Sequence, residues 1–99
     1  MSSPSNAPAP APAASFSPDR GYRLSPSVAL RPEPFGALAY HFGTRRLSFL
    51  KDPALVRLVE HLGEHTSARE ALAALPAARH EPTLRALAAL AATDMIVPL

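Results

Sequence analysis

The fold is decided by residues 35–50, which read Phe35-Gly-Ala-Leu-Ala-Tyr-His-Phe-Gly-Thr-Arg-Arg-Leu-Ser-Phe-Leu50. We interpret this stretch as a β-hairpin, because Gly43-Thr44 fits a two-residue type II′ turn with glycine at its first central position. The turn fixes the cross-strand pairs Phe42–Arg45, His41–Arg46, Tyr40–Leu47, Ala39–Ser48, Leu38–Phe49 and Ala37–Leu50. Side chains alternate between the two faces of a strand, so one face gathers the apolar residues Leu38, Tyr40, Phe42, Leu47 and Phe49. We expect the helices that follow the hairpin to cover this apolar face.

The second strand of the hairpin is expected to leave an open edge. In a two-residue-loop hairpin the residues flanking the turn, Phe42 and Arg45, exchange backbone hydrogen bonds, and bonded pairs then alternate with non-bonded pairs. The amides of Leu47 and Phe49 are therefore predicted to bond inward, to the neighbouring strand. The outward amides are predicted to be those of Arg46, Ser48 and Leu50. Such an edge is a template for another chain.

The N-terminal region divides into a tail and a first strand. Residues 1–18 are almost wholly Pro, Ala and Ser, a composition that favours a disordered, polyproline-like tail, although a ligand for a proline-recognising groove is the alternative. We expect the folded domain to comprise residues 19–99. Its first strand is predicted from residues 22–24 and 28–31, with a break at Ser25-Pro26, and it completes a three-stranded antiparallel sheet in chain order.

Three short helices are predicted after the hairpin. Asp52-Pro53 starts the first, which ends at Gly63. Ser67 and Glu70 fit a capping box for the second, which ends before Pro76. Residues 81–92 form the third, and residues 95–99 are an apolar strand or extended tail that packs back on the domain. The predicted architecture is a winged-helix-like α+β module.

Composition limits the possible functions. The 99 residues include no cysteine, which excludes disulfides, thiolate metal sites and cysteine nucleophiles. The net charge of +2 and the pI of about 9.7 argue only weakly for an acidic partner. No apolar run approaches a membrane span, and the N-terminus does not look like a secretory signal, so we expect a cytoplasmic protein without a membrane partner.

The sequence contains no recognisable catalytic or metal-binding pattern. His61 and His65 are four residues apart and adjoin Glu60 and Glu64, but Gly63 lies between them and no third ligand has a matching spacing. His41 is interpreted as a solvent-facing cross-strand partner of Arg46. We therefore expect neither an enzyme nor a bound metal or cofactor.

A longer run makes the sequence recognisable. It reads Leu30-Arg-Pro-Glu-Pro-Phe-Gly-Ala-Leu-Ala-Tyr-His-Phe-Gly-Thr-Arg-Arg-Leu-Ser-Phe-Leu-Lys51, and it closely resembles the peptide-chaperone family of mycofactocin biosynthesis. That family is similar to the chaperone of pyrroloquinoline quinone biosynthesis, and both are precursor-recognition proteins for ribosomally made peptides. The resemblance extends from about residue 18 to the C-terminus.

The resemblance implies a non-catalytic adaptor, and we expect the protein to be a monomer. Such proteins bind the leader of a precursor peptide and present it to a radical S-adenosylmethionine maturase, which here would decarboxylate and crosslink a C-terminal Val-Tyr. In the family the leader adds as a strand beside the third β-strand and packs towards the third helix. Mapped onto this chain, the implied peptide-binding residues are Arg45, Arg46, Leu47, Ser48, Phe49, Leu50, Lys51, Leu84, Arg85, Leu87, Ala88 and Ala91. The basic members of this set could attract an acidic leader.

Two other functions are alternatives to this one. A winged-helix nucleic-acid binder should present several basic or amide side chains from its third helix, but between residues 81 and 94 only Arg85 is basic. We therefore expect no nucleic-acid partner. An adaptor for a different maturase is the other alternative, and the sequence leaves it open.

Overall fold

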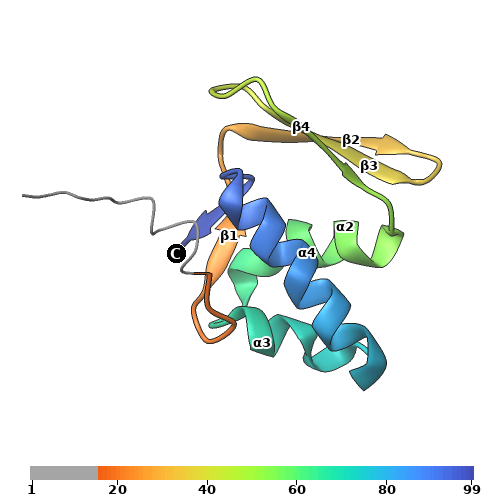
Figure 1. The fold of residues 1–99 in the computed structure, drawn as a ribbon, viewed down its shortest axis with the longest axis vertical. Helices are drawn as coiled ribbons and strands as arrows, with labels where there is room; N and C mark the ends of the chain where they lie inside the picture. The colour runs from red at the N-terminus through yellow and green to blue at the C-terminus, as the bar shows by residue number, and fades with distance from the viewer. Residues whose placement is uncertain (1–15) are drawn as a thin grey trace, which may run out of the picture.

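The computed structural model describes residues 16–99 and has the expected α+β architecture, with a three-stranded antiparallel sheet that has three α-helices on one side (Figure 1). The strands are β1 (Tyr22–Leu24), β2 (Val28–Glu33), β3 (Gly36–His41), β4 (Leu47–Leu50) and β5 (Ile96–Pro98). The α-helices are α2 (Pro53–Glu60), α3 (Ala68–Ala71) and α4 (His80–Ala92), joined by 3₁₀ turns at Leu62–Glu64, Leu72–Ala74 and Ala77–Arg79. The predicted tail of residues 1–18 lies, up to residue 15, outside the described residues. No helix in this described part is both long enough and apolar enough to cross a bilayer.

The pairing register of the hairpin is confirmed, but its turn is not the predicted one. β3 and β4 pair Ala37 with Leu50 and Tyr40 with Leu47, as expected. The type II′ turn at Gly43-Thr44 is wrong, because the positive φ of 62° is at Arg45. The Arg45 amide donates to the His41 carbonyl at 2.8 Å, so the loop contains the four residues 42–45.

The side chain of His41 explains this longer loop. Its Nδ1 accepts hydrogen bonds from the backbone N–H groups of Gly43 at 3.0 Å and Thr44 at 3.1 Å. The ring therefore provides the hydrogen-bond acceptor for two backbone amides of the loop, and this stabilises the four-residue form. The expectation that His41 faces solvent is wrong, since only 8% of the residue is exposed.

The face of the hairpin that meets the helices is the opposite of the predicted one. Ala37, Ala39 and Leu50 are buried against the helices, whereas Phe42, Leu47 and Phe49 are exposed. In Figure 1 all three helices lie on one side of this sheet. Small side chains on β3 allow a helix to approach closely, so volume as well as hydrophobicity decides which face is covered.

The first strand also differs from the prediction. Residues 22–24 do not join the three-stranded sheet, whose order is β2-β3-β4, but pair as β1 with β5 in a separate two-stranded sheet. The Ser25 amide donates to the Met95 carbonyl at 2.9 Å, and this bond holds the end of β1 next to the C-terminal segment. The prediction that residues 95–99 pack back on the domain is confirmed. Pro32 lies in the edge strand β2, where a missing donor is tolerated.

The predicted helix starts are confirmed in their local chemistry. The Asp52 side chain accepts from the Ala54 amide at 2.9 Å, with Pro53 at the first helical position. The Ser67 hydroxyl accepts from the Glu70 amide at 3.0 Å. The Glu70 carboxylate accepts from the amide of Thr66 rather than from that of Ser67, so only one of the two hydrogen bonds of the capping box forms as expected. α4 begins at residue 80, one residue before the predicted start.

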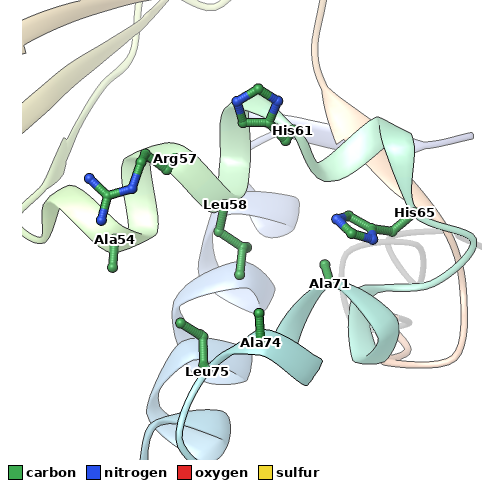
Figure 2. A pocket seen from close by; sticks show the side chains of 8 residues that line it. All are labelled: Ala54, Arg57, Leu58, His61, His65, Ala71, Ala74 and Leu75. Carbon is green, nitrogen blue, oxygen red and sulfur yellow. The ribbon is translucent and has the colours of Figure 1, made fainter.

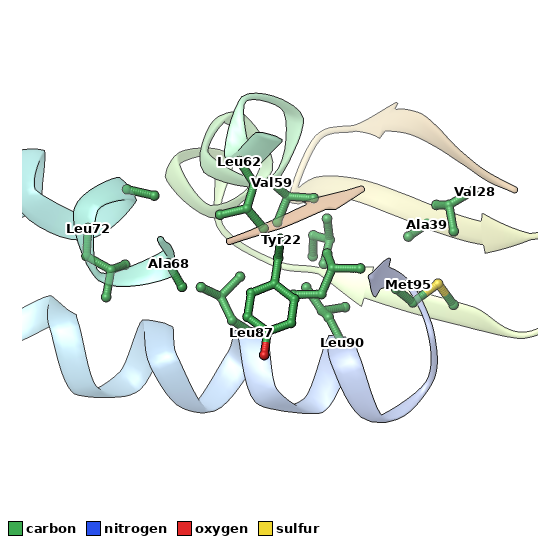
Figure 3. Close-up of a cluster of buried hydrophobic side chains, with 13 residues drawn as sticks. Tyr22, Val28, Ala39, Val59, Leu62, Ala68, Leu72, Leu87, Leu90 and Met95 are labelled. Atoms are coloured by element: carbon green, nitrogen blue, oxygen red, sulfur yellow. The ribbon is translucent and has the colours of Figure 1, made fainter. Parts of the chain in front are cut away.

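The core lies where the two small sheets meet the helices (Figure 3). Tyr22 is central in it, and Phe16 stacks on its ring with centroids 5.0 Å apart. Its buried members are Tyr22, Val28, Ala39, Leu50, Val59, Leu62, Ala68, Ala71, Leu72, Leu87, Leu90, Met95 and Ile96. Leu50 and Leu87 attach β4 and α4 to this core, and they thereby position the site described next.

Candidate functional site

β4 is one of the two edge strands of the three-stranded sheet, and its hydrogen-bonding pattern determines which backbone groups are free at that edge. The His41 amide donates to the Arg46 carbonyl at 3.0 Å, so these two residues form a bonded pair. Bonded and non-bonded pairs alternate in an antiparallel ladder, so Ser48 and Leu50 bond inward to β3. The amides of Leu47 and Phe49 therefore point outward. This is the reverse of the predicted pattern, because a four-residue loop shifts the alternation by one residue.

A groove lies between β4 and α4. Its volume is about 300 Å³, and its lining residues are Ser48, Phe49, Leu50, Leu55, Ala86, Ala89, Leu90 and Thr93. The α4 residues in this set follow a spacing of three and four, so they form one stripe of the helix. Two of them, Ala86 and Ala89, have small side chains, which allow another backbone to come close to the helix. Of the two residues with outward amides, Phe49 lines this groove, and Leu47 precedes the lining residue Ser48 on the strand.

A second hollow continues the groove towards the start of α4. It has a volume of about 190 Å³ and shares Leu55 and Ala86 with the first. Its other lining residues are Asp52, Ala78, Arg79, Pro82 and Thr83. Arg79 forms an ion pair with Asp52 at this end. The combined groove is thus apolar along α4 and becomes charged where α4 begins.

The structure brings together only part of the predicted peptide-binding set. On the β4 side, Ser48, Phe49 and Leu50 line the groove. Leu47 is exposed beside them on the strand. The three basic residues of this segment are exposed at the two ends of β4, with Arg45 in the loop, Arg46 directly before the strand and Lys51 directly after it.

The predicted face of α4 does not line the groove. Leu87 is fully buried in the core, while Leu84 and Ala91 are half-buried against it. Ala88 is half-buried, and Arg85 is exposed with its Nη1 at 3.8 Å from Glu81. The predicted set lacks Ala86, Ala89, Leu90 and Thr93, because leucine-rich spacing favours the stripe of α4 that the core uses. The signal available in the sequence was the adjacent stripe of small residues.

A separate hollow of about 230 Å³ contains the two histidines considered as a metal pair. It is lined by Ala54, Arg57, Leu58, His61, His65, Ala71, Ala74 and Leu75, and Figure 2 shows that the two imidazole rings do not converge on one point. His61 Nδ1 lies 2.9 Å from the Glu64 carboxylate, and this contact raises the pKa of His61 and lowers that of Glu64. Within residues 16–99, no three His, Asp or Glu side chains gather as metal ligands would.

Comparison with known proteins gives consistent matches. The model of the Peptide chaperone MftB family matches residues 21–97. A protein of Mycobacterium ulcerans (strain Agy99) named Peptide chaperone MftB is 50% identical over 97 residues, covering 96% of this chain and 89% of the relative. Proteins of the same name are 51% identical in Mycobacterium tuberculosis (strain ATCC 25618 / H37Rv) and 52% identical in Mycolicibacterium smegmatis (strain ATCC 700084 / mc(2)155). Each of these two matches covers 84% of this chain, with 78% and 83% of the respective relative. No solved structure matches the chain significantly.

Proposed function

Because the chain belongs to the Peptide chaperone MftB family, we propose that it binds the leader of the mycofactocin precursor peptide and presents it to a radical S-adenosylmethionine maturase. The chain itself is a non-catalytic adaptor, and the chemistry belongs to the maturase. What this protein contributes is a surface that holds one chain in an extended conformation next to another protein.

The leader binds by adding a strand to β4. The observation that carries this proposal is the pair of outward amides on the edge strand, Leu47 and Phe49, of which Phe49 also lines the apolar groove beside α4. In strand addition, main-chain hydrogen bonds provide affinity, while pockets for alternate side chains provide register. A leader strand beside β4 accepts from these two amides.

The groove receives every second side chain of the leader. Side chains of an added strand alternate between the two faces of the sheet. Those on the inner face enter the groove against Ala86, Ala89 and Leu90, where small side chains on α4 leave room for apolar ones. Those on the other face remain outside, next to the exposed side chains of Leu47 and Phe49.

Exposed cations assist the encounter with an acidic leader. Arg45 and Arg46 lie at one end of the β4 edge and Lys51 at the other. Charges at the rim of an interface accelerate association more than they increase its strength. We expect the association rate to fall as ionic strength rises, because exposed charges are screened at about 10 Å in 0.1 M salt.

Residue-resolved hydrogen exchange with and without a synthetic leader peptide tests this proposal. The leader should slow the exchange of the Leu47 and Phe49 amides, which lack a partner on β3, and should change Ser48 much less, because its amide is already bonded. A DNA duplex at the same concentration serves as the control for the nucleic-acid alternative. Leader binding that protects neither Leu47 nor Phe49 would place the peptide elsewhere.

A further inference from the structure

The side of the three-stranded sheet that faces away from the helices is apolar and uncovered by any described residue. We call it the outer face, and it consists of Phe35, Leu38, Tyr40, Phe42, Leu47 and Phe49. Its exposed fractions are 41% for Phe35, 57% for Phe42, 59% for Leu47 and 60% for Phe49. The aromatic rings pack edge to face, Phe35 with Phe49 at 6.0 Å and Tyr40 with Phe42 at 5.6 Å. In Figure 1 the helices all lie on the other side of this sheet.

The size of the outer face is that of a binding surface. With about 200 Å² for a whole large side chain, the four most exposed residues present on the order of 400 Å² of apolar surface. A patch of this size lies within the range of the largest patches on monomeric proteins, which are often functional. It also equals roughly half of what one partner contributes to a stable interface of standard size, about 800 Å². A polar rim would supply the remainder.

The charges around the outer face argue against a second copy of this chain as the occupant. Arg45 and Arg46 lie at its turn end, and Lys51 lies towards the opposite end. Arg31 and Glu33 on β2 form an ion pair at 3.0 Å and so balance each other's charge. Two copies packed face to face would bring cations against cations at both ends. The complementary surface is an apolar patch surrounded by carboxylates.

The outer face is continuous with the proposed leader site through β4. Leu47 and Phe49 direct their amides to the edge and their side chains to the outer face, so a leader strand added at that edge would extend this face by one strand. A protein docked there would contact the adaptor and the bound peptide together.

We propose that the outer face is the surface on which the maturase docks, through an apolar patch rimmed by acidic side chains. This inference rests on the proposed function, because it assigns the second partner of that same adaptor. Aromatic side chains near the centre of such an interface dominate its binding energy. Phe42 is the best residue for a test, since it is exposed and lies outside both β4 and the groove.

The experiment measures two affinities for each full-length variant, one for the purified maturase and one for the synthetic leader. Phe42→Ser should weaken maturase binding at least tenfold and change leader binding less than twofold. Leu99→Ser is the matched control, because Leu99 is equally exposed at 63% but lies outside the outer face, and it should change neither affinity. Thermal melts should show both variants folded.

Each other outcome overturns the inference. Unchanged maturase binding by Phe42→Ser would remove the outer face from that interface, and an equal loss of leader binding would assign the face to the peptide. A concentration-dependent dimer in sedimentation, abolished by Phe42→Ser while maturase binding persists, would make the face a self-association surface. Failure of the proposed function would give a different result, because the wild-type protein itself would then not bind the leader.

Discussion

A proline placed at two adjacent positions of β4 distinguishes the free edge of this strand from its bonded edge. Leu47→Pro removes an amide that points outward, whereas Ser48→Pro removes an amide that bonds to β3. Proline has no N–H, so each change deletes one donor. We expect Leu47→Pro to keep the fold and lose the leader, and Ser48→Pro to destabilise the domain.

The magnitudes follow from the environment of each amide. In Ser48→Pro a buried carbonyl on β3 loses its partner, and the ring intrudes between the strands, at a combined cost of about 3 kcal/mol. The described part of the chain can be expected to hold roughly 4–12 kcal/mol in total, so the thermal midpoint should fall by about 12–24 °C. Leu47→Pro should cost less than about 1 kcal/mol of folding free energy. Its effect on the complex should be about 2–4 kcal/mol, because a leader carbonyl loses its donor on binding, and this corresponds to roughly 30- to 1,000-fold weaker affinity.

The assay combines leader titration by calorimetry or fluorescence anisotropy with thermal melts of the same samples. Leu47→Ala and Ser48→Ala are the matched controls, since each changes the side chain and retains the amide. If Leu47→Pro is folded and binds the leader as well as Leu47→Ala does, strand addition at this edge is refuted. If Ser48→Pro melts with the wild type, the assignment of inward and outward amides is wrong.

Three further predictions concern the core, the groove and the pH dependence. Phe49→Ala should lower the free energy of unfolding by less than about 1 kcal/mol, because Phe49 is exposed. The adjacent Leu50→Ala, at a position 2% exposed, should lower it by about 3 kcal/mol. Equal losses in denaturant titrations would contradict the orientation of β4. Ala89→Leu should weaken leader binding at least tenfold by filling the groove while the melting temperature stays within a few degrees, and unimpaired binding would remove α4 from the site. Hydrogen bonds from the backbone and side chain of Thr66 lower the pKa of Glu70 from 4.5. Because the pKa is lower in the folded state, the ionised Glu70 stabilises the fold above pH 4.5. This contribution is lost as the pH falls through the folded-state pKa. Melts recorded from pH 6 to pH 3 should therefore show a smaller loss for Glu70→Gln than for the wild type, and identical profiles would be evidence against this contribution.

The sequence by itself determined the features that depend on neighbouring residues. The start of α2 at Asp52-Pro53 and the cap of α3 at Ser67 were predictable, because each hydrogen bond spans only two or three residues. The pairing of β3 with β4 was also predictable, since the alternation of side chains across the strands restricts the register. These interactions do not require knowledge of the rest of the fold.

The orientation of the hairpin was decided by the tertiary structure. Both of its faces carry apolar residues, and hydrophobicity alone favoured the one with Leu38, Tyr40 and Phe49. The helices instead pack on the face with Ala37 and Ala39, where small side chains allow close approach. This is why an aromatic surface remains exposed although its hydrophobicity predicts that it is buried.

The chemistry of the β4 edge and of the groove was decided in the same way. A four-residue loop, stabilised by the His41 ring, reversed which amides point outward without altering which residues pair. The pairing of β1 with β5 and the choice of the Ala86–Ala89 stripe of α4 depend on segments far apart in the chain. Local patterns specify where elements begin and end and how neighbouring strands align. Which surface each element buries depends instead on the shape of its distant partners, because packing is a property of both sides of a contact.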